Sequence, residues 1–406
     1  MAETVSDIVI LEGARTPMAE YNGAFSDVTA IDLGVYAARE ALERSGTEPG
    51  EVDHVIFGNA LQTSADAIYG ARHVGLKAGV PKEVPALTVN RLCGSGFESI
   101  VQGAHRILLG EATTVLAGGM ENMSQAPHVI RGARRGLRLG QGQLEDSLMV
   151  ALLDSYCGLY MAETSDRVAS KYGISRAEQD AYALSSQQRA AQAWAQCRLS
   201  EEVVPVEVKT GRRTVRVEKD DHLRPDSTLE ALAALPPSFG KDGGVTAGNA
   251  SGIVDGAAAV VVTTAGAAKA KGRKPLGRLV SWAVVGVEPE LMGLGPAPAA
   301  RKAIAKAGLK LEDIGLWEIN EAFAGQILGV MRELSLDRET LNVNGGAIAL
   351  GHPLAATGTR CTLTLLKEMR RRGLRYGVAG ACIGGGQGIA IVVESAASAV
   401  PAAGLA

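Results

Sequence analysis

Aromatic side chains, long apolar runs and closely spaced cysteines are all scarce in this chain. Phe, Trp and Tyr together make up 4% of its 406 residues. No apolar stretch is long enough to span a bilayer, so we expect no membrane insertion. The five cysteines include no C-x-x-C pair, which argues against a structural zinc site and gives no sign of a disulfide framework. We therefore predict no metal site, and free thiols in a reducing compartment.

Strong charge of either sign is also missing. Lys and Arg number 41 against 44 Asp and Glu, for a formal net charge of −3, and the only local exception is the basic run at 131–138. This balance implies neither nucleic acid nor an anionic membrane as a partner. The first seven residues are acidic, unlike a signal peptide or an Arg-rich transit peptide. Together with the free cysteines, they predict a cytoplasmic location.

The chain is long, and short segments from its first part recur in similar form in its last part. We call each such recurrence an echo. Its 406 residues exceed the roughly 250–300 at which one core stops growing, so two or three subdomains are expected. A helical stretch that ends at Gly46 and leads into a short strand recurs later in the chain, ending at Gly308. Residues 87–90 and 341–344 have the sequences LTVN and LNVN, and residues 115–119 and 378–382 have VLAGG and VAGAC. Three echoes in the same order predict a duplicated α/β unit.

Residues 123–252 have no counterpart in the other half and differ in character. Residues 175–199 have the pattern of an amphipathic helix that opens with a capping box at Ser175. Residues 203–217 alternate like two strands joined by a turn at Gly211. We predict an inserted loop domain here. The expected division is an N-terminal half at 1–122 and 253–273, the inserted domain at 123–252 and a C-terminal half at 274–406.

Cys93 lies in a Gly-rich turn between a predicted strand at 84–89 and a predicted helix at 97–109. Backbone N–H groups and the positive end of the helix dipole stabilise a thiolate at such a turn, so we expect the pKa of Cys93 to lie below the usual value of about 8.5. This context favours a nucleophile. The alternative is a small buried side chain with a packing role. The two further Gly-rich turns, at His352 and Cys382, argue against it.

His352 is the one histidine of six that sits in a Gly-rich turn, just before a predicted helix that begins near Thr357 or Gly358. A base that activates a thiol must come within hydrogen-bond distance of it. The echo makes this turn the counterpart of the Cys93 turn, so we expect the two to meet where the halves meet. The alternative, a histidine with a purely structural role, is the better interpretation of the other five.

Cys382 stands at a predicted hairpin tip, before three consecutive glycines at 384–386 and between strands at 377–382 and 388–394. Such a tip can direct backbone N–H groups at a developing oxyanion while the thiol moves a proton. A plain hairpin with a packing cysteine is the alternative. Asn320 follows a predicted strand at 316–319 and could orient a water molecule or the histidine.

These motifs closely resemble those of the thiolases. The matching segments are Val89 to Gly96, Gly248 to Gly252, Asn320 to Ala324, Gly351 to Pro353 and Cys382 to Gly388. They occur in the family's order and spacing, and the resemblance extends over nearly the whole chain. It implies an α/β fold of two duplicated halves, layered α/β/α/β/α, with an inserted loop domain.

The resemblance also implies a role for each residue of the site. Cys93 is the nucleophile that becomes acylated, His352 activates it, and Cys382 is the acid and base that exchanges a proton with the acetyl carbon. Asn320, through a water molecule, forms one oxyanion hole with His352. The backbone N–H groups of Cys93 and Gly384 form the other. The thioester intermediate implies ping-pong kinetics.

Coenzyme A and its acyl thioesters are the implied substrates, and no cofactor beyond CoA is expected. The residues that match the family's binding positions are Arg224, Phe239, Ala247, Ser251 and Phe323, with Met161 beside the acyl pocket. Each has a simpler alternative, as a solvated loop residue or as part of a core. The segment from Met123 to Glu145 corresponds to the one through which many thiolases pair dimers, so a homodimer or homotetramer is expected.

Three alternatives concern the type of enzyme. Acetoacetyl-CoA thiolases usually carry His-Met-Gly near the acyl pocket, whereas residues 159–164 are LYMAET. Residues 348–354 and 124–127 look more like the mitochondrial type of 3-oxoacyl-CoA thiolase, although an acetoacetyl-CoA-specific biosynthetic enzyme stays an alternative. A ketosynthase is expected to have a second histidine in place of Cys382. A non-catalytic lipid-binding protein on this fold is expected to have lost one of the three key residues.

Overall fold

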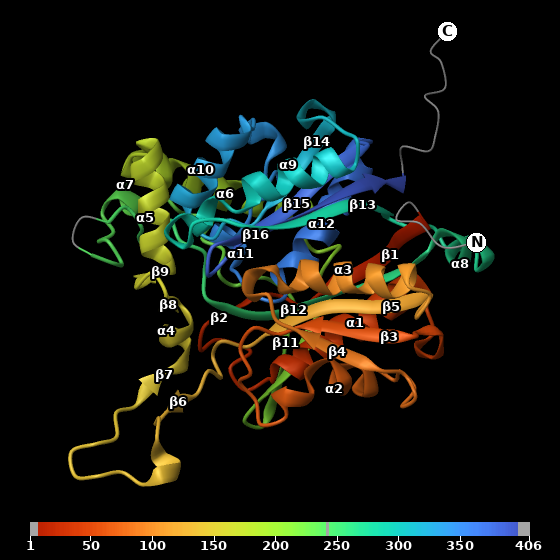
Figure 1. Cartoon of the computed structure of the whole chain (residues 1–406), viewed down its shortest axis with the longest axis horizontal. Coiled ribbons are helices and arrows are strands. Elements are labelled where there is room, and N and C mark those ends of the chain that lie inside the picture. Colours follow the sequence, from red (N-terminus) through yellow and green to blue (C-terminus); the bar gives the residue numbers. More distant parts are fainter. Residues whose placement is uncertain (1–6, 241–242, 397–406) are drawn as a thin grey trace.

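The centre of the protein is one continuous path of hydrogen-bonded strands. The computed structural model describes residues 7–240 and 243–396 (Figure 1). Within them the sheet has ten strands in the order β14-β15-β16-β13-β1-β12-β5-β3-β4, with β2 paired to β12. The predicted features of residues 1–6 lie outside the described residues.

The elements are given in three groups along the predicted division of the chain. The first group is β1 (Ile8–Arg15), β2 (Ala19–Glu20), α1 (Ala30–Ser45), β3 (His54–Gly58), α2 (Gly70–Lys77), β4 (Ala86–Val89), α3 (Ser95–Leu108), β5 (Thr114–Glu121), β12 (Val254–Thr264) and α8 (Ala265–Ala270). The second is β6 (His128–Val129), β7 (Glu145–Asp146), α4 (Ser147–Ala151), β8 (Leu153–Asp154), β9 (Leu159–Tyr160), α5 (Met161–Tyr172), α6 (Arg176–Ala195), β10 (Val206–Thr210), β11 (Arg213–Val217) and α7 (Leu229–Ala233). The third is β13 (Gly277–Gly286), α9 (Pro296–Lys306), β14 (Ile314–Ile319), α10 (Ala324–Leu334), α11 (Ala347–Leu350), α12 (Thr357–Arg372), β15 (Tyr376–Ile383) and β16 (Gln387–Ser395).

The two halves of the sheet repeat one pairing pattern. In the first half β3 lies parallel to β5, which is antiparallel to β12. In the second half β14 lies parallel to β15, which is antiparallel to β16. The halves join between β1 and β13 through only two residue pairs, Val9 with Arg278 and Ile10 with Gly277. The sheet is therefore two half-sheets with a short seam, as the echoes predict.

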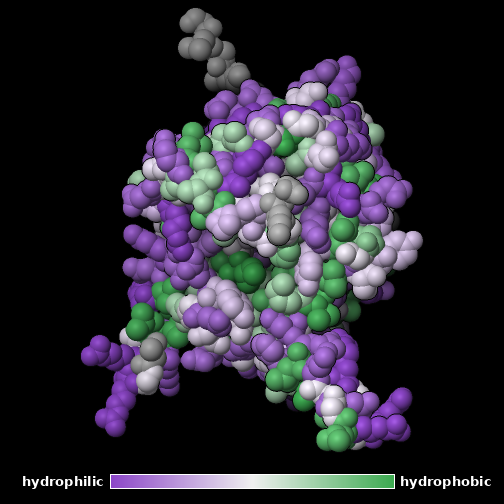
Figure 2. All heavy atoms as spheres, turned by 90° about the vertical axis from the view of Figure 1, so that its left-hand side faces the viewer, coloured by the Kyte–Doolittle hydropathy of each residue, from purple (hydrophilic) through white to green (hydrophobic). Residues whose placement is uncertain are grey.

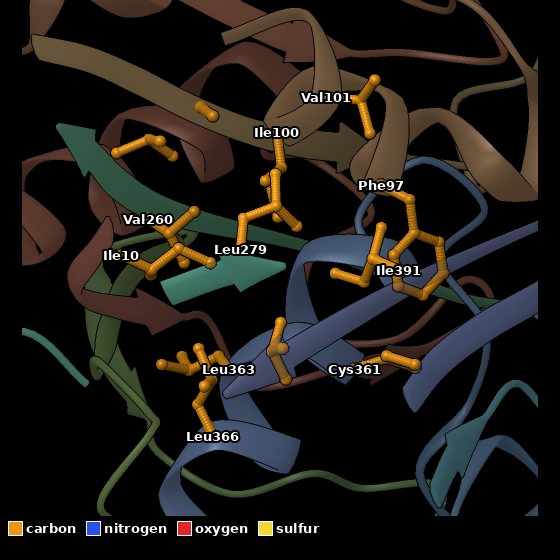
Figure 3. Packing of buried hydrophobic residues seen from close by; sticks show 14 of the residues in the cluster. Ile10, Phe97, Ile100, Val101, Val260, Leu279, Cys361, Leu363, Leu366 and Ile391 are labelled. Atoms are coloured by element: carbon orange, nitrogen blue, oxygen red, sulfur yellow. The ribbon is translucent and has the colours of Figure 1, made fainter. Parts of the chain in front are cut away.

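The largest hydrophobic core fills the space between the half-sheets. Helices α3 and α12 lie there side by side and pack against strands of both halves (Figure 1). Figure 3 shows Phe97 of α3 and Leu363 of α12 in this core with Val260 and Ile391 from the two half-sheets. These side chains are almost fully buried, and burying each contributes about 1.5–3 kcal/mol. The middle layer thus brings the beginnings of α3 and α12 together.

Two further cores lie on the outer faces. Helices α1 and α2 cover the first half-sheet through one cluster, which includes Leu33, Val74 and Phe57. Helices α9 and α10 cover the second through another, which includes Ile304 and Ile327. The order of layers is helix, sheet, helix, sheet, helix. The predicted α/β/α/β/α fold is confirmed.

The echo at 341–344 differs from its counterpart. Residues 86–89 form β4 and pair with β3 along four positions, whereas Leu341 makes only an isolated parallel bridge to Trp317. Asn342 has a φ of 47°, and its side chain accepts from the N–H of Ile319 at 2.9 Å and donates to its C=O at 2.8 Å. One side chain there supplies the hydrogen bonds that a strand would otherwise make.

Helix α6 begins at the predicted capping box, where Ser175 and Glu178 bond to each other's backbone N–H. The hairpin of β10 and β11 turns at Gly211, whose φ is 62°. The strand pair β6 and β7 carries a long exposed arm away from the body (Figure 1). In the described part of the chain, no helix is long and apolar enough to cross a bilayer. The boundaries of the inserted domain stay a prediction.

Candidate active site

Cys93 occupies a one-turn 3-10 helix, η4 (Leu92–Gly94), between β4 and α3. Three short hydrogen bonds hold this turn. Asn90 Oδ1 accepts from Leu92 N at 2.9 Å, Ser95 Oγ donates to the C=O of Leu92 at 2.7 Å, and Arg91 N donates to Ser95 Oγ at 2.8 Å. Leu92 has a φ of 47°, uncommon for a side chain of this size. The strand-to-helix turn predicted for Cys93 is confirmed.

The predicted low pKa of Cys93 is wrong. Burial and, to a smaller extent, the nearby carboxylate of Glu121 raise the pKa of the thiol to about 12. The backbone N–H groups of Gly384 and of Cys93 itself act in the opposite direction without outweighing burial. Cys93 is half-buried. A charged sulfur there loses part of its hydration, and two N–H dipoles do not make up for the loss. The resting nucleophile is therefore a thiol.

His352 is held by hydrogen bonds at its backbone and at one ring nitrogen. Its N–H donates to the C=O of Gly252 at 2.9 Å. Nδ1 lies 2.6 Å from Oγ1 of Thr357, the first residue of α12, whose own proton goes to the C=O of Pro353 at 3.1 Å. Nδ1 therefore carries the proton and donates it to Thr357, and Nε2 keeps its lone pair.

Asn320 faces that lone pair. Its Nδ2 lies 3.3 Å from Nε2 of His352 and its backbone N–H donates to the C=O of Gly380 at 2.9 Å. Its Oδ1 is buried and has no hydrogen-bond partner among the described residues. An orphaned buried oxygen is costly unless a water molecule or ligand satisfies it. Asn320 is thus suited to hold a water molecule or a substrate oxygen next to His352.

Burial also keeps His352 neutral. It lowers the pKa of the imidazole to about 3, and the buried guanidinium of Arg360 lowers it further. Cys93 and His352 are therefore both uncharged near neutral pH. A proton transfer from the thiol must accompany the attack of the sulfur rather than precede it.

Lowering the pH below about 6.5 is expected to destabilise the fold through His352. The unfolded imidazole takes up a proton with a pKa near 6.5, whereas the folded one stays neutral down to about pH 3. The unfolded state binds more protons over this window, so the free energy of unfolding falls with the pH and levels off below about 3. Urea unfolding between about pH 4 and 7 should show a weaker dependence in His352→Gln than in the parent. Equal slopes in the two proteins would contradict a neutral His352.

Cys382 comes from the other side of the site, at the end of β15. It is buried in a small apolar cluster with Met292 and Ala322. Burial raises the pKa of its thiol well above the usual range, and the neighbouring Cys93 sulfur raises it further. This interaction shows that the two thiols are neighbours. Cys382 is consequently a protonated thiol at rest, able to donate a proton.

Backbone hydrogen bonds lock three of the motifs together. Ser251 N donates to the C=O of Ala322 at 2.9 Å, and Ala324 N donates to the C=O of Asn249 at 2.9 Å. The bond from His352 to Gly252 attaches the histidine turn to the same segment. Residues 248–252 therefore connect the segment of Asn320 to the turn of His352.

A mostly apolar cavity of about 170 Å³ reaches His352. Its lining includes Met161, Phe239, Ser251 and Phe323. The rings of Phe239 and Tyr160 lie 5.2 Å apart, and a Cβ placed on Gly384 would lie 3.4 Å from Met161 Sδ. Figure 2 shows that the face carrying the inserted segment is hollowed near its centre, with apolar side chains at the bottom.

The other two predicted binding residues lie elsewhere. Arg224 and Ala247 line a separate, wider cavity of about 590 Å³, with Gln187 and Ser227 among its polar residues. Arg224 forms an ion pair with Glu20 across it. The predicted binding set is thus divided between a narrow apolar cavity and a wider polar one, which meet along residues 247–253.

Sequence reasoning missed two residues of the site, Thr357 and Glu121. Thr357 fixes the tautomer of His352, but a threonine at the start of a helix has many ordinary roles. Glu121 is fully buried at the end of β5. In the sequence, Glu121 could have been singled out as a carboxylate that ends a strand of small and apolar residues.

Two relatives cover nearly all of this chain. The human protein named 3-ketoacyl-CoA thiolase, mitochondrial, is 53% identical over 393 residues, which cover 96% of this chain and 98% of that protein. The acetyl-CoA acetyltransferase of Rhizobium meliloti (strain 1021) is 46% identical over 388 residues, 95% of this chain and 98% of that protein.

A solved structure has the same fold. The crystal structure of human mitochondrial 3-ketoacyl-CoA thiolase has a TM-score of 0.94 at 52% identity and covers 97% of this chain and 100% of that one. The structure of that enzyme in complex with CoA has a TM-score of 0.93 at 52% identity and covers 96% and 98%.

The predicted cytoplasmic location is contradicted by these relatives. The proteins from human, orangutan and cattle that are 50–53% identical are all named as mitochondrial. The prediction relied on the composition of residues 1–7 and on free cysteines, and a mitochondrial protein can share both. Bacterial relatives at 45–46% identity are also similar.

Family profiles match both halves of the chain. Residues 8–266 match the profile described as thiolase, N-terminal domain, and residues 273–395 match the profile described as thiolase, C-terminal domain. Both profiles run through the segments that carry the site residues. The chain belongs to the thiolase family.

Proposed function

We propose that this protein is an acyltransferase that cleaves 3-oxoacyl-CoA with a second CoA, and that runs the reverse Claisen condensation by the same path. Two observations support the proposal: the thiols of Cys93 and Cys382 interact, and His352, paired with Asn320, lines the apolar cavity. A thiol nucleophile, a neutral imidazole and a second thiol are the groups that this chemistry needs.

The first half-reaction transfers the acyl group to Cys93. The sulfur attacks the 3-keto carbon while the unprotonated Nε2 of His352, which faces Asn320 Nδ2 at rest, takes the thiol proton. The bond between C2 and C3 then breaks, the acyl group stays on Cys93, and acetyl-CoA leaves as an enolate. The thiol of Cys382 gives its proton to C2 of the enolate and becomes a thiolate.

The second half-reaction returns the enzyme to its starting state. The thiol of a second CoA attacks the carbonyl carbon of the Cys93 thioester and gives its proton to the Cys382 thiolate. The shortened acyl-CoA leaves, and the Cys93 sulfur takes back the proton held by His352. The N–H groups of Gly384 and Cys93, which face the sulfur, are suited to stabilise the oxyanion in this step.

CoA is proposed to run from the wider cavity into the narrow one. Arg224 offers a positive charge to a phosphate once Glu20 is displaced, and Ala247 and Ser251 lead from one cavity to the other. Phe239 and Phe323 then enclose the thioester arm, and Met161 ends the acyl pocket. CoA acts here as a substrate, and the proposal calls for no further cofactor.

Rates across 3-oxoacyl-CoA chain lengths test the proposal. We expect cleavage of both four-carbon and medium-length substrates, because Met161 is a flexible side chain and the relatives at 50–53% identity carry the name 3-ketoacyl-CoA thiolase. Steady-state kcat/KM with each substrate is the measurement. Activity confined to acetoacetyl-CoA would favour the biosynthetic alternative instead, and no activity at any length would contradict the proposal.

The ketosynthase and the non-catalytic alternatives are not favoured. Cys382 stands where a ketosynthase is expected to carry histidine. A non-catalytic protein is expected to have lost at least one of Cys93, His352 and Cys382, but all three are present, and Cys382 interacts with Cys93.

A homodimer or homotetramer stays a prediction. Strand β4 is at one end of the sheet, and the neighbouring Ile68 and Tyr69 are exposed. An edge strand with apolar neighbours is suited to pair with a second copy. Sedimentation equilibrium that gives a monomer would contradict the prediction.

A further inference from the structure

Glu121 is a buried carboxylate that hydrogen bonds connect to both catalytic turns, and the proposed mechanism gives it no task. It is fully buried at the end of β5. Its oxygens accept four hydrogen bonds: Oε1 from Asn59 Nδ2 at 3.0 Å and Leu61 N at 2.9 Å, and Oε2 from Ala60 N at 3.1 Å and Ala355 N at 3.0 Å. Four donors match the four lone-pair sites of an ionised carboxylate.

One of these bonds holds the turn of His352. Ala355 lies three residues after the histidine, in a segment before α12 that is neither helix nor strand. Backbone N–H groups at both ends tie this segment to other parts of the chain, His352 N to the C=O of Gly252 and Ala355 N to Glu121. Glu121 therefore fixes the C-terminal end of the loop that aims the imidazole.

The other bonds lead to the turn of Cys93. Glu121 orders residues 59–61, and the C=O of Ala60 accepts from Asn90 Nδ2 at 3.2 Å. The Oδ1 of the same Asn90 accepts from the N–H of Leu92, next to Cys93, at 2.9 Å. A continuous chain of hydrogen bonds thus runs from one catalytic turn through Glu121 to the other.

We propose that Glu121 is a positioning residue that fixes the turn of Cys93 relative to the turn of His352. The inference rests on the proposed function, in which these two side chains act together. Only the ionised carboxylate can accept all four hydrogen bonds, because a protonated oxygen would turn a donor toward an N–H group. Burial and, to a smaller extent, the carboxylate of Asp255 on β12 raise the pKa of Glu121 to about 7, against the hydrogen bonds from the backbone N–H groups, which lower it. The thiol of Cys93 also interacts with Glu121.

The test compares Glu121→Gln with the parent in two assays. Gln has the same shape, but its amide group turns N–H donors toward two of the four donors. We expect kcat for acetoacetyl-CoA cleavage to fall by about 10²-fold, with KM changed by less than about 2-fold. We also expect alkylation of Cys93 by iodoacetamide, followed by mass spectrometry, to slow by about 10-fold.

The alkylation rate separates positioning from a purely electrostatic effect. The charge of Glu121 raises the pKa of Cys93, so its removal alone would make the thiol more acidic and alkylation faster. Faster or unchanged alkylation in a folded Glu121→Gln protein overturns the proposal. Glu202→Gln is the matched control, since Glu202 is equally buried but bonds to Arg15 and Thr364. An equal loss in that variant also overturns it.

A second variant decides the matter if Glu121→Gln does not fold. Asn90 is exposed, so Asn90→Ala leaves the core intact and cuts the chain between Ala60 and Leu92. Alkylation should slow by about 3-fold, and an unchanged rate overturns the proposal. Alkylation needs no carbon–carbon chemistry. A parent protein that cleaves no 3-oxoacyl-CoA therefore refutes the proposed function while this comparison still tests the role of Glu121.

Discussion

Replacing Cys93 with alanine is expected to lower kcat for acetoacetyl-CoA cleavage by about 10⁴-fold or more, because the acyl group then has no atom to which it can be transferred. The alanine fits the turn, since Asn90, Ser95 and the backbone hold Leu92 without help from the sulfur. The apolar cavity is lined by other residues, so acyl-CoA should still bind. Rates should be measured together with the Kd for a non-cleavable acyl-CoA analogue.

Cys157→Ala is the matched control for this variant. Cys157 is half-buried like Cys93 but lies in the inserted segment, outside the three motifs that meet at the site. Its replacement should leave kcat within about 2-fold of the parent. Parent-like cleavage by Cys93→Ala would remove the nucleophile from the mechanism, and intact mass spectrometry should also find no acyl adduct on that variant.

The secondary structure around the catalytic residues could be predicted because it depends on local sequence. The strand before Cys93, the hairpin around Cys382 and the cap of α6 at Ser175 follow from alternation, glycine and capping patterns within a few residues. The duplication of the α/β unit followed from the echoes, and each half repeats the same pairings. The order of layers was implied by the resemblance to the thiolases.

Properties that depend on distant contacts could not be predicted. The pKa of Cys93 is set by burial between two halves, and a local pattern indicates only the helix dipole that opposes it. Residues 341–344 do not form a strand like their counterpart at 87–90, because the side chain of Asn342 bonds to the backbone of Ile319 instead. Glu121 gains its role from Ala355, which is 234 positions away. These are all cases in which tertiary contacts outweigh the local pattern.

Replacing Cys382 with serine is expected to separate the two chemical tasks of the site. A hydroxyl in this buried apolar cluster is a much weaker acid than a thiol, so the enolate cannot be protonated efficiently. We expect carbon–carbon cleavage to fall by about 10³-fold. Transfer of an acetyl group from acetyl-CoA to Cys93 needs no proton exchange at carbon, so it should persist and appear as an acetyl adduct by mass spectrometry.

Hydrogen exchange gives the most direct measurement of this proton transfer. In D₂O the parent should exchange the methyl protons of acetyl-CoA, because Cys382 removes and returns them, and Cys382→Ser should not. Cys361→Ser is the control, since Cys361 is equally buried but lies on α12 in the core between the half-sheets, away from the reacting carbon. Parent-like exchange by Cys382→Ser would assign the proton to another group, and His352 would then be the one to test, because its Nε2 lone pair is the other free base at the site.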